Sequence, residues 1–204
     1  MTVKSILSKL ESYSQELDLD LTRSEDRFKW FLASILFAKR ISAEVAKKTY
    51  RRFEEEGLNT PEKILEAGWD RLVEVLDSGG YVRYDFSTAS NLLATVKELR
   101  QKYGTLKELH RKSNSPTELE SRLQEFRGVG PVGVNIFLRE LRGIWEKAKP
   151  KPSQIAIKTA NKLGFENVKS NESALVRLNL EYCKKEKCKE CPAQSHCKEK
   201  NKIK

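Results

Sequence analysis

The chain has 204 residues, 38% of them hydrophobic and 8% aromatic, so it can bury a sizeable core. Its 39 Lys and Arg outnumber 29 Asp and Glu, and this formal net charge of +10 favours a polyanionic partner such as nucleic acid. The chain shows no apolar signal sequence at its start, and its most apolar stretch, residues 31–38, is far too short to cross a bilayer. We therefore expect a cytoplasmic protein without a membrane partner.

Helical patterns dominate the first half of the chain. Apolar residues recur at helical spacing over residues 3–10 and again from Phe28 to Leu36. The sequence TRSE at 22–25 has the form of a capping box, in which a hydroxyl and a carboxylate cap one helix reciprocally. Four helix starts are predicted, at Thr22, at Ser42, at Thr60 followed by Pro61, and at Ser115 followed by Pro116.

The second half continues in the same way. A loop is expected over residues 78–85, and a long helix should follow it and end at Gly104. Beyond Pro131 the pattern predicts a helix to about Trp145, and the Lys- and Pro-rich residues 146–154 then form the best internal boundary. Two more helices, near 154–163 and 172–182, precede the cysteines. The chain is therefore predicted to be all-α, with roughly ten helices joined by short loops.

A glycine hairpin lies between two of these helices, in the sequence EFRGVGPVGVN at 125–135. Gly128 can adopt the left-handed conformation that ends a helix, and Gly130 leaves room for another backbone to approach. Pro131 then begins a helix whose free N–H groups and positive dipole end face outward. Such a helix start suits a phosphate group, although an ordinary helical hairpin would have the same glycines.

Four cysteines, Cys183, Cys188, Cys191 and Cys197, give the spacing C-x4-C-x2-C-x5-C within one short segment. Zinc modules more often use two C-x2-C knuckles or separated Cys and His pairs. A single loop with four thiolates suits a [4Fe-4S] cluster, whose irons present four corners to one wrapping segment. Zinc is the second interpretation and disulfides are the third. His196, next to Cys197, is expected to be solvated.

Four segments resemble the endonuclease III family of DNA glycosylases and occur in the same order as in that family. They are residues 35–50, 123–138, 161–165 and the cysteine loop. In its helix-hairpin-helix element, Gly128, Val129, Gly130 and Asn135 match the family's hairpin. The resemblance implies a helical barrel over 24–142, with the helix-hairpin-helix at 118–142, and a second part made of 1–23 and 143–204 that carries the cluster loop, 183–197. The family has six residues between its first two cysteines, whereas this chain has four.

The same resemblance implies a monomer that binds double-stranded DNA in base-excision repair. The hairpin residues Gly128, Val129 and Gly130 would contact the DNA backbone. Lys39 falls where the family usually has a glutamine, so it and the adjacent Arg40 would contact phosphate instead, or Lys39 is a solvated helix end. The matching loop of the family, at 78–86 here, wedges into the base stack, so Tyr81 and Tyr84 would stack on bases while Arg83 meets phosphate. The alternative is that one tyrosine belongs to the core and the other is an ordinary loop residue.

Two catalytic groups of the family are absent. The hairpin lysine that attacks the sugar is replaced by Val132, which cannot form a Schiff base. The aspartate of monofunctional members falls at Ser153 or Pro152, and no aspartate follows Asp85 in the chain. Asp85 and Glu146 are carboxylate candidates by elimination only. We expect a DNA-binding protein without the usual chemistry; a monofunctional glycosylase with a non-standard carboxylate, or an RNA-binding or partner-docking module, are the alternatives.

Overall fold

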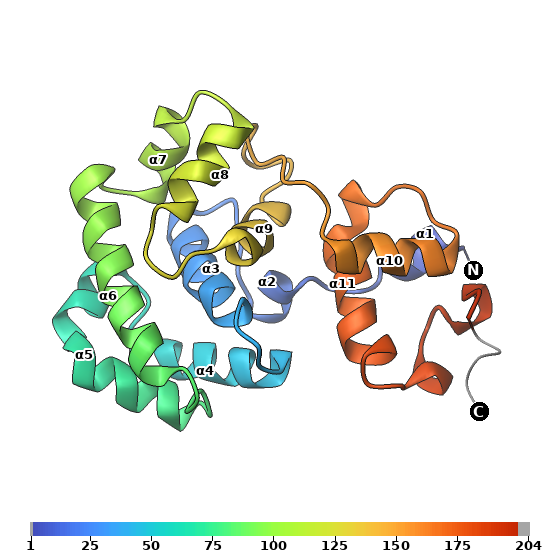
Figure 1. The fold of residues 1–204 in the computed structure, drawn as a ribbon, viewed down its shortest axis with the longest axis horizontal. Helices are drawn as coiled ribbons and strands as arrows, with labels where there is room; N and C mark the ends of the chain where they lie inside the picture. Colours follow the sequence, from blue (N-terminus) through green and yellow to red (C-terminus); the bar gives the residue numbers. More distant parts are fainter. Residues whose placement is uncertain (1, 200–204) are drawn as a thin grey trace. The chain divides into compact units, whose positions relative to one another are not determined.

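The computed structural model describes residues 2–199, and within them the chain is helical and contains no strand. The predicted all-α class is therefore confirmed. Figure 1 shows the order of the elements along the chain. The α-helices are α1 (Val3–Leu7), α2 (Tyr13–Glu16), α3 (Ser24–Phe37), α4 (Ala43–Glu55), α5 (Pro61–Ser78), α6 (Asp85–Lys102), α7 (Leu106–Lys112), α8 (Pro116–Gln124), α9 (Pro131–Arg139), α10 (Gln154–Leu163) and α11 (Glu172–Leu178).

The chain divides into two compact units. Unit 1 comprises residues 1–16 and 151–204, of which 1 and 200–204 lie outside the described residues, and unit 2 comprises residues 17–150. The sequence placed the boundaries at 24 and 142, so residues 17–23 and 143–150 belong with the larger unit rather than with the cysteine-bearing one. Leu17, Leu19 and Leu21 are all buried, which explains why unit 2 begins before the first long helix.

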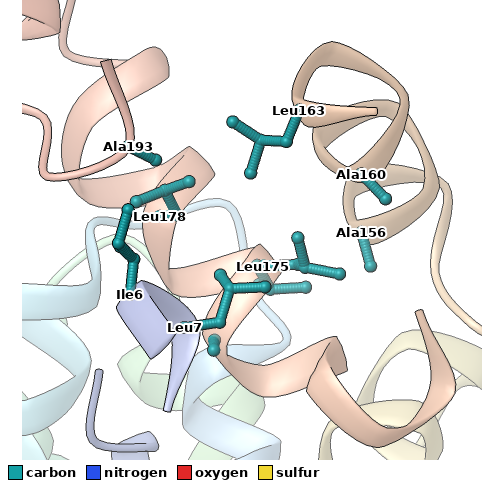
Figure 2. Close-up of a cluster of buried hydrophobic side chains, with 10 residues drawn as sticks. Ile6, Leu7, Ala156, Ala160, Leu163, Leu175, Leu178 and Ala193 are labelled. Atoms are coloured by element: carbon teal, nitrogen blue, oxygen red, sulfur yellow. The ribbon is translucent and has the colours of Figure 1, made fainter. Parts of the chain in front are cut away.

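Unit 1 is built on a small apolar core to which the N-terminal helix contributes (Figure 2). Ile6 and Leu7 of α1 lie in one cluster with Leu175 and Leu178 of α11 and with the small residues Ala156 and Ala160 of α10. Ala193, from the cysteine segment, is fully buried in the same cluster, and Cys191 and Cys197 pack against its edge. The cysteine segment is thus attached to the helices by burial of apolar surface.

Unit 2 is organised around α3, which is buried along most of its length and contacts α4, α7 and α9. Trp30 is completely buried, and its indole N–H donates to the Phe137 carbonyl of α9 at 3.2 Å. Phe31 makes edge-on ring contacts with Phe137, at 5.2 Å between centroids, and with Phe126, at 6.1 Å. These contacts fix α9, and with it the glycine hairpin, against α3.

Three of the four predicted helix starts are confirmed. The hydroxyls of Ser42, Thr60 and Ser115 each accept a hydrogen bond from the backbone N–H three residues later. The predicted capping box at 22–25 is wrong. Asp20 accepts both the N–H of Thr22, at 3.0 Å, and its hydroxyl, at 2.7 Å, so this side chain is held in a turn and α3 begins at Ser24 without a side-chain cap.

Other helix boundaries also differ from the prediction. Gly68, with φ +72°, introduces a kink within α5, and α9 ends at Arg139 instead of continuing to Trp145. The C-terminal helix passes into a π-helix, η2 (Asn179–Cys183), and two short 3₁₀ turns follow, η3 (Cys188–Glu190) and η4 (Gln194–His196). Within residues 2–199, every helix is either too short or too polar to cross a membrane.

Candidate nucleic-acid interface and cysteine loop

The hairpin between α8 and α9 contains one position, Gly128, at which any residue other than glycine would be strained. Gly128 has φ +83°, as predicted for the left-handed end of a helical segment. A Cβ at this position would lie 2.5 Å from Nδ2 and 2.9 Å from Cβ of Asn91, which comes from α6. The close approach of α6 therefore requires glycine as much as the backbone angle does. The neighbouring carbonyl of Arg127 accepts the Thr95 hydroxyl of α6 at 3.0 Å.

Gly130 is different, because it has ordinary extended backbone (φ −92°, ψ 178°) and no atom within 4 Å of where a Cβ would be. It immediately precedes α9, with Pro131 at the first helical position, and it has no side chain to cap the helix. Val132 follows with 61% of its side chain exposed. This helix start is therefore open on its outer side and suited to an anion.

Val129 lies between the two glycines and is buried, at 4% exposure. Its N–H donates to the Phe126 carbonyl at 3.0 Å. Its side chain anchors the hairpin in the core, and its contact with DNA stays a prediction.

Tyr81 requires a correction. Its side chain is 1% exposed, and its hydroxyl donates to the Leu36 carbonyl, near the end of α3, at 2.9 Å. Burial raises the pKa of this phenol, so it remains a donor at neutral pH. A tyrosine held in this way cannot stack on bases, and it serves instead to fasten the 79–84 loop onto α3. Tyr84 is half-buried, with the Arg83 guanidinium 5.6 Å above its ring.

The C-terminal end of α3 is where the separate predicted segments meet. Tyr81 joins the 79–84 loop to Leu36, and Gly133, in the first turn of α9, lies against Ala38, with 3.5 Å from its would-be Cβ to that of Ala38. Lys39 and Arg40 directly follow Ala38 in the chain. The structure thus brings the glycine hairpin, the 79–84 loop and the two basic residues to one end of one helix, although the contacting residues Ala38 and Gly133 are 95 positions apart in sequence.

The basic residues at the end of α3 and beside the hairpin are not held in ion pairs within the described part of the chain. No carboxylate within residues 2–199 forms an ion pair with Lys39, Arg40, Arg83 or Arg127. By contrast, exposed arginines such as Arg52, Arg71 and Arg111 are paired with glutamates of their own helices. Arg127, which precedes Gly128 and is exposed, was missed in the sequence, where nothing but its adjacency to the hairpin marks it.

Sequence reasoning also missed the apolar side chains that this region exposes. Val82 and Phe86 each have 61% of their side chains exposed, and Trp69 has 39%. Trp69 and Phe86 form a tilted ring pair at 5.4 Å, and the Trp69 indole donates to the Ser90 hydroxyl. Large exposed apolar residues around a loop are typical of a recognition surface. The sequence analysis predicted base stacking by Tyr81 and Tyr84, but the exposed apolar residues are the nearby Val82 and Phe86.

The two carboxylate candidates lie in different local settings. Asp85, at the start of α6, accepts the Phe86 N–H at 2.7 Å, and Glu146 is 79% exposed on its side chain and lies 3.7 Å from Lys147. Ser153, one of the two positions predicted to match the family's aspartate, caps α10 by accepting the Ala156 N–H. Glu172, which no sequence pattern marks, is buried and accepts the Ser153 N–H at 2.8 Å.

The four cysteines follow one another around a loop of short turns. Cys183 ends the π-helix η2, Cys188 begins η3, and Cys191 and Cys197 directly follow η3 and η4. All four are free thiols of intermediate exposure, which excludes disulfides among them in this structure. Between Cys183 and Cys188, Glu186 has a left-handed backbone, at φ +56°.

The thiols interact with one another electrostatically. Burial raises the pKa of Cys183, Lys162 lowers it, and the other three thiols raise it further. Burial likewise raises the pKa of Cys191, while a hydrogen bond from the Ala193 N–H to its sulfur opposes the shift. Lys162, in the last turn of α10, also forms an ion pair with Glu199 at 2.8 Å. Within residues 2–199, no three His, Cys, Asp or Glu side chains are gathered closely enough to hold a metal ion.

Comparison with known proteins does not assign the chain to a family: no protein-family model matches it, and no curated protein sequence matches it.

Proposed function

We propose that this chain is a helix-hairpin-helix protein of the endonuclease III type, which binds damaged or distorted duplex DNA and does not use that family's usual chemistry. The observation that carries the proposal is the meeting of the hairpin, the 79–84 loop and Lys39–Arg40 at the end of α3. A backbone anion site beside unpaired basic side chains suits phosphate, which positions a protein on a duplex without reading its sequence.

The exposed apolar residues support distorted rather than regular DNA as the ligand. Val82 lies next to Arg83 in the loop that Tyr81 fastens to α3, and Phe86 lies in the first turn of α6, which follows the loop. Apolar side chains inserted at a base step cost a few kcal/mol of unstacking. That cost is lowest where a mismatch or a lesion has already weakened the stack.

We further propose that Cys183, Cys188, Cys191 and Cys197 hold a [4Fe-4S] cluster. The proposal is supported by four free, partly buried thiols that follow one another in a single loop, by the Ala193 N–H that bonds to the Cys191 sulfur, and by Lys162, whose positive charge would offset that of the thiolates. A tetrahedral zinc ion would require sulfurs about 3.8 Å apart, from Zn–S bonds of ~2.3 Å, whereas a cubane takes thiols spread more widely. When bound, the cluster would cross-link the loop and could exchange one electron.

The DNA proposal predicts that Gly130→Asp weakens duplex binding about tenfold at low salt, because the new carboxylate repels phosphate at the start of α9. Gly130→Asn is the matched control, since it has the same shape without the charge. Both variants should fold, because φ is −92° and the space around the Cβ is open. Fluorescence anisotropy with a mismatched duplex at several salt concentrations measures the effect.

Equal affinity of the Asp and Asn variants for DNA would show that the hairpin is only a structural turn. The wild-type affinity should also fall steeply with salt, as expected when phosphate contacts release counterions. A salt-independent affinity would contradict the assignment of the basic residues.

A second candidate function is a monofunctional glycosylase, and the observation that favours it is the Glu172 carboxylate beside Ser153. Glu172 is buried and already caps α10 through the Ser153 N–H, so we prefer the non-catalytic function. We expect no base excision from a panel of lesion duplexes and no borohydride-trapped imine, since Val132 has no amine. Excision that disappears in Glu172→Gln, with the melting temperature unchanged, would establish the second candidate.

A further inference from the structure

The backbone on either side of Cys183, the first cysteine, adopts conformations that are locally unfavourable. Residues Asn179–Cys183 form a π-helix, in which the Lys184 N–H bonds to the Asn179 carbonyl five residues back at 2.8 Å. Wide turns of this kind are rare and are kept where the surroundings support them. Three residues beyond Cys183, Glu186 has a left-handed backbone, which is also unfavourable for a residue with a Cβ. Contacts from elsewhere in unit 1 must therefore hold Cys183 in place.

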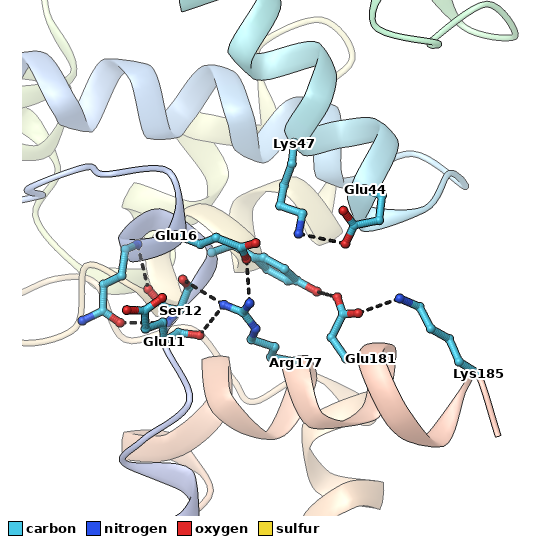
Figure 3. Close-up of polar contacts among 10 residues, drawn as sticks. Glu11, Ser12, Glu16, Glu44, Lys47, Arg177, Glu181 and Lys185 are labelled. Atoms are coloured by element: carbon cyan, nitrogen blue, oxygen red, sulfur yellow. Dashed lines mark hydrogen bonds and ion pairs between the residues drawn. The ribbon is translucent and has the colours of Figure 1, made fainter. Parts of the chain in front are cut away.

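The N-terminal segment supplies those contacts. Figure 3 shows Arg177 and Glu181, from α11 and η2, turned toward residues 11–16. The Arg177 guanidinium forms an ion pair with Glu16 at 2.7 Å and donates to the Glu11 carbonyl at 2.8 Å. It also lies 5.2 Å above the Tyr13 ring. Arg177 thus contacts both Glu11 and Glu16, at the two ends of the segment. Its guanidinium has several donors in a fixed planar arrangement, which lysine lacks.

Tyr13 reaches the π-helix itself. Its ring is 2% exposed, and its hydroxyl donates to Glu181 Oε1 at 3.0 Å. The other oxygen of Glu181 pairs with Lys185 at 2.6 Å. Burial and the Glu181 carboxylate raise the pKa of the phenol, so Tyr13 stays protonated and remains the donor. Glu181 therefore connects the N-terminal segment to residues on both sides of Cys183.

We propose that residues 11–16 position Cys183, with Tyr13, Arg177 and Glu181 as the positioning residues. Helix α1, which precedes this segment, is attached to the unit's core separately, because Ile6 and Leu7 share a cluster with Leu175, Leu178 and Ala193. Loss of the polar network should leave that core folded and release the turn that ends in Cys183. The consequence for a bound cluster rests on the proposed function, whereas the positioning of the thiol does not.

The test compares Tyr13→Phe with Tyr50→Phe. Tyr50 is also buried and donates to a glutamate, Glu54, at 3.0 Å, but it lies in unit 2. In the metal-free full-length protein, limited labelling with N-ethylmaleimide and mass spectrometry of the peptides gives the rate for each cysteine. We expect Tyr13→Phe to label Cys183 roughly three- to tenfold faster, the population change expected from one lost buried hydrogen bond. Tyr50→Phe should match the wild type.

Arg177→Gln should have the same effect as Tyr13→Phe, and Arg177→Lys should restore part of the protection, because it keeps the charge facing Glu16. An unchanged Cys183 rate in Tyr13→Phe, or an equal increase in Tyr50→Phe, would overturn the positioning role.

A second measurement, on iron-loaded protein, follows the decay of the cluster absorbance in excess chelator. Tyr13→Phe should lose the cluster roughly three- to tenfold faster than Tyr50→Phe does. If wild-type protein binds no iron, the cofactor proposal fails, and the labelling experiment still decides the positioning. If wild type binds iron and both variants release it at the wild-type rate, the network does not govern the metal site.

Discussion

Protein purified without oxygen should contain about four irons and four sulfides per chain, and Cys188→Ser should lose nearly all of both. Cys188 begins η3, in a segment whose one fully buried side chain is Ala193, so the loop has little apolar burial to hold it without a cross-link. Losing one ligand should therefore lower the stability of unit 1 by about 3 kcal/mol or more in the loaded protein. Iron and sulfide analysis, with the visible absorbance spectrum, measures the first effect.

The metal-free protein provides the control for Cys188→Ser. Cys188 is only partly buried, so without metal the substitution should change the free energy of unfolding by less than about 1 kcal/mol. A large effect there would assign the thiol a packing role. If protein made with ample iron contains stoichiometric zinc and no iron, the cluster proposal is wrong. The same four thiols would then form a zinc centre.

Gly128→Ala should destabilise unit 2 by about 3 kcal/mol. A left-handed backbone costs a residue with a Cβ about 1 kcal/mol. The remainder comes from forcing Asn91 away, because its Cβ, and not only its flexible end, lies within 2.9 Å. All three tryptophans lie in unit 2, at positions 30, 69 and 145, so their fluorescence during denaturation reports on that unit alone.

Gly130→Ala is the matched control for Gly128→Ala, since Gly130 has extended backbone and open space, and it should be nearly neutral. Combining Gly128→Ala with Asn91→Ala removes two of the three contacting atoms, so the double variant should cost less than the sum of the single ones. Strict additivity, or an equal cost at both glycines, would show that the approach of α6 is not what demands glycine at 128.

Features that depend on a few neighbouring residues could be predicted from the sequence. A hydroxyl that caps a helix bonds to an N–H three residues away, so Ser42, Thr60 and Ser115 were recognisable without a fold. The left-handed Gly128 and the succession of four cysteines are local in the same sense. The all-α class follows because helical periodicity repeats along the whole chain.

Features that depend on what packs against a residue were decided by the tertiary structure. Thr22 has the sequence of a cap, but Asp20 captures its hydroxyl. Tyr81 and Val82 are adjacent, yet only the packing of their loop on α3 buries the first and exposes the second. Glu172 beside Ser153, and Tyr13 beside Glu181, join residues 19 and 168 positions apart. Whether a side chain is buried depends on which other parts of the folded chain pack around it. A sequence pattern indicates only which residues are suited to burial.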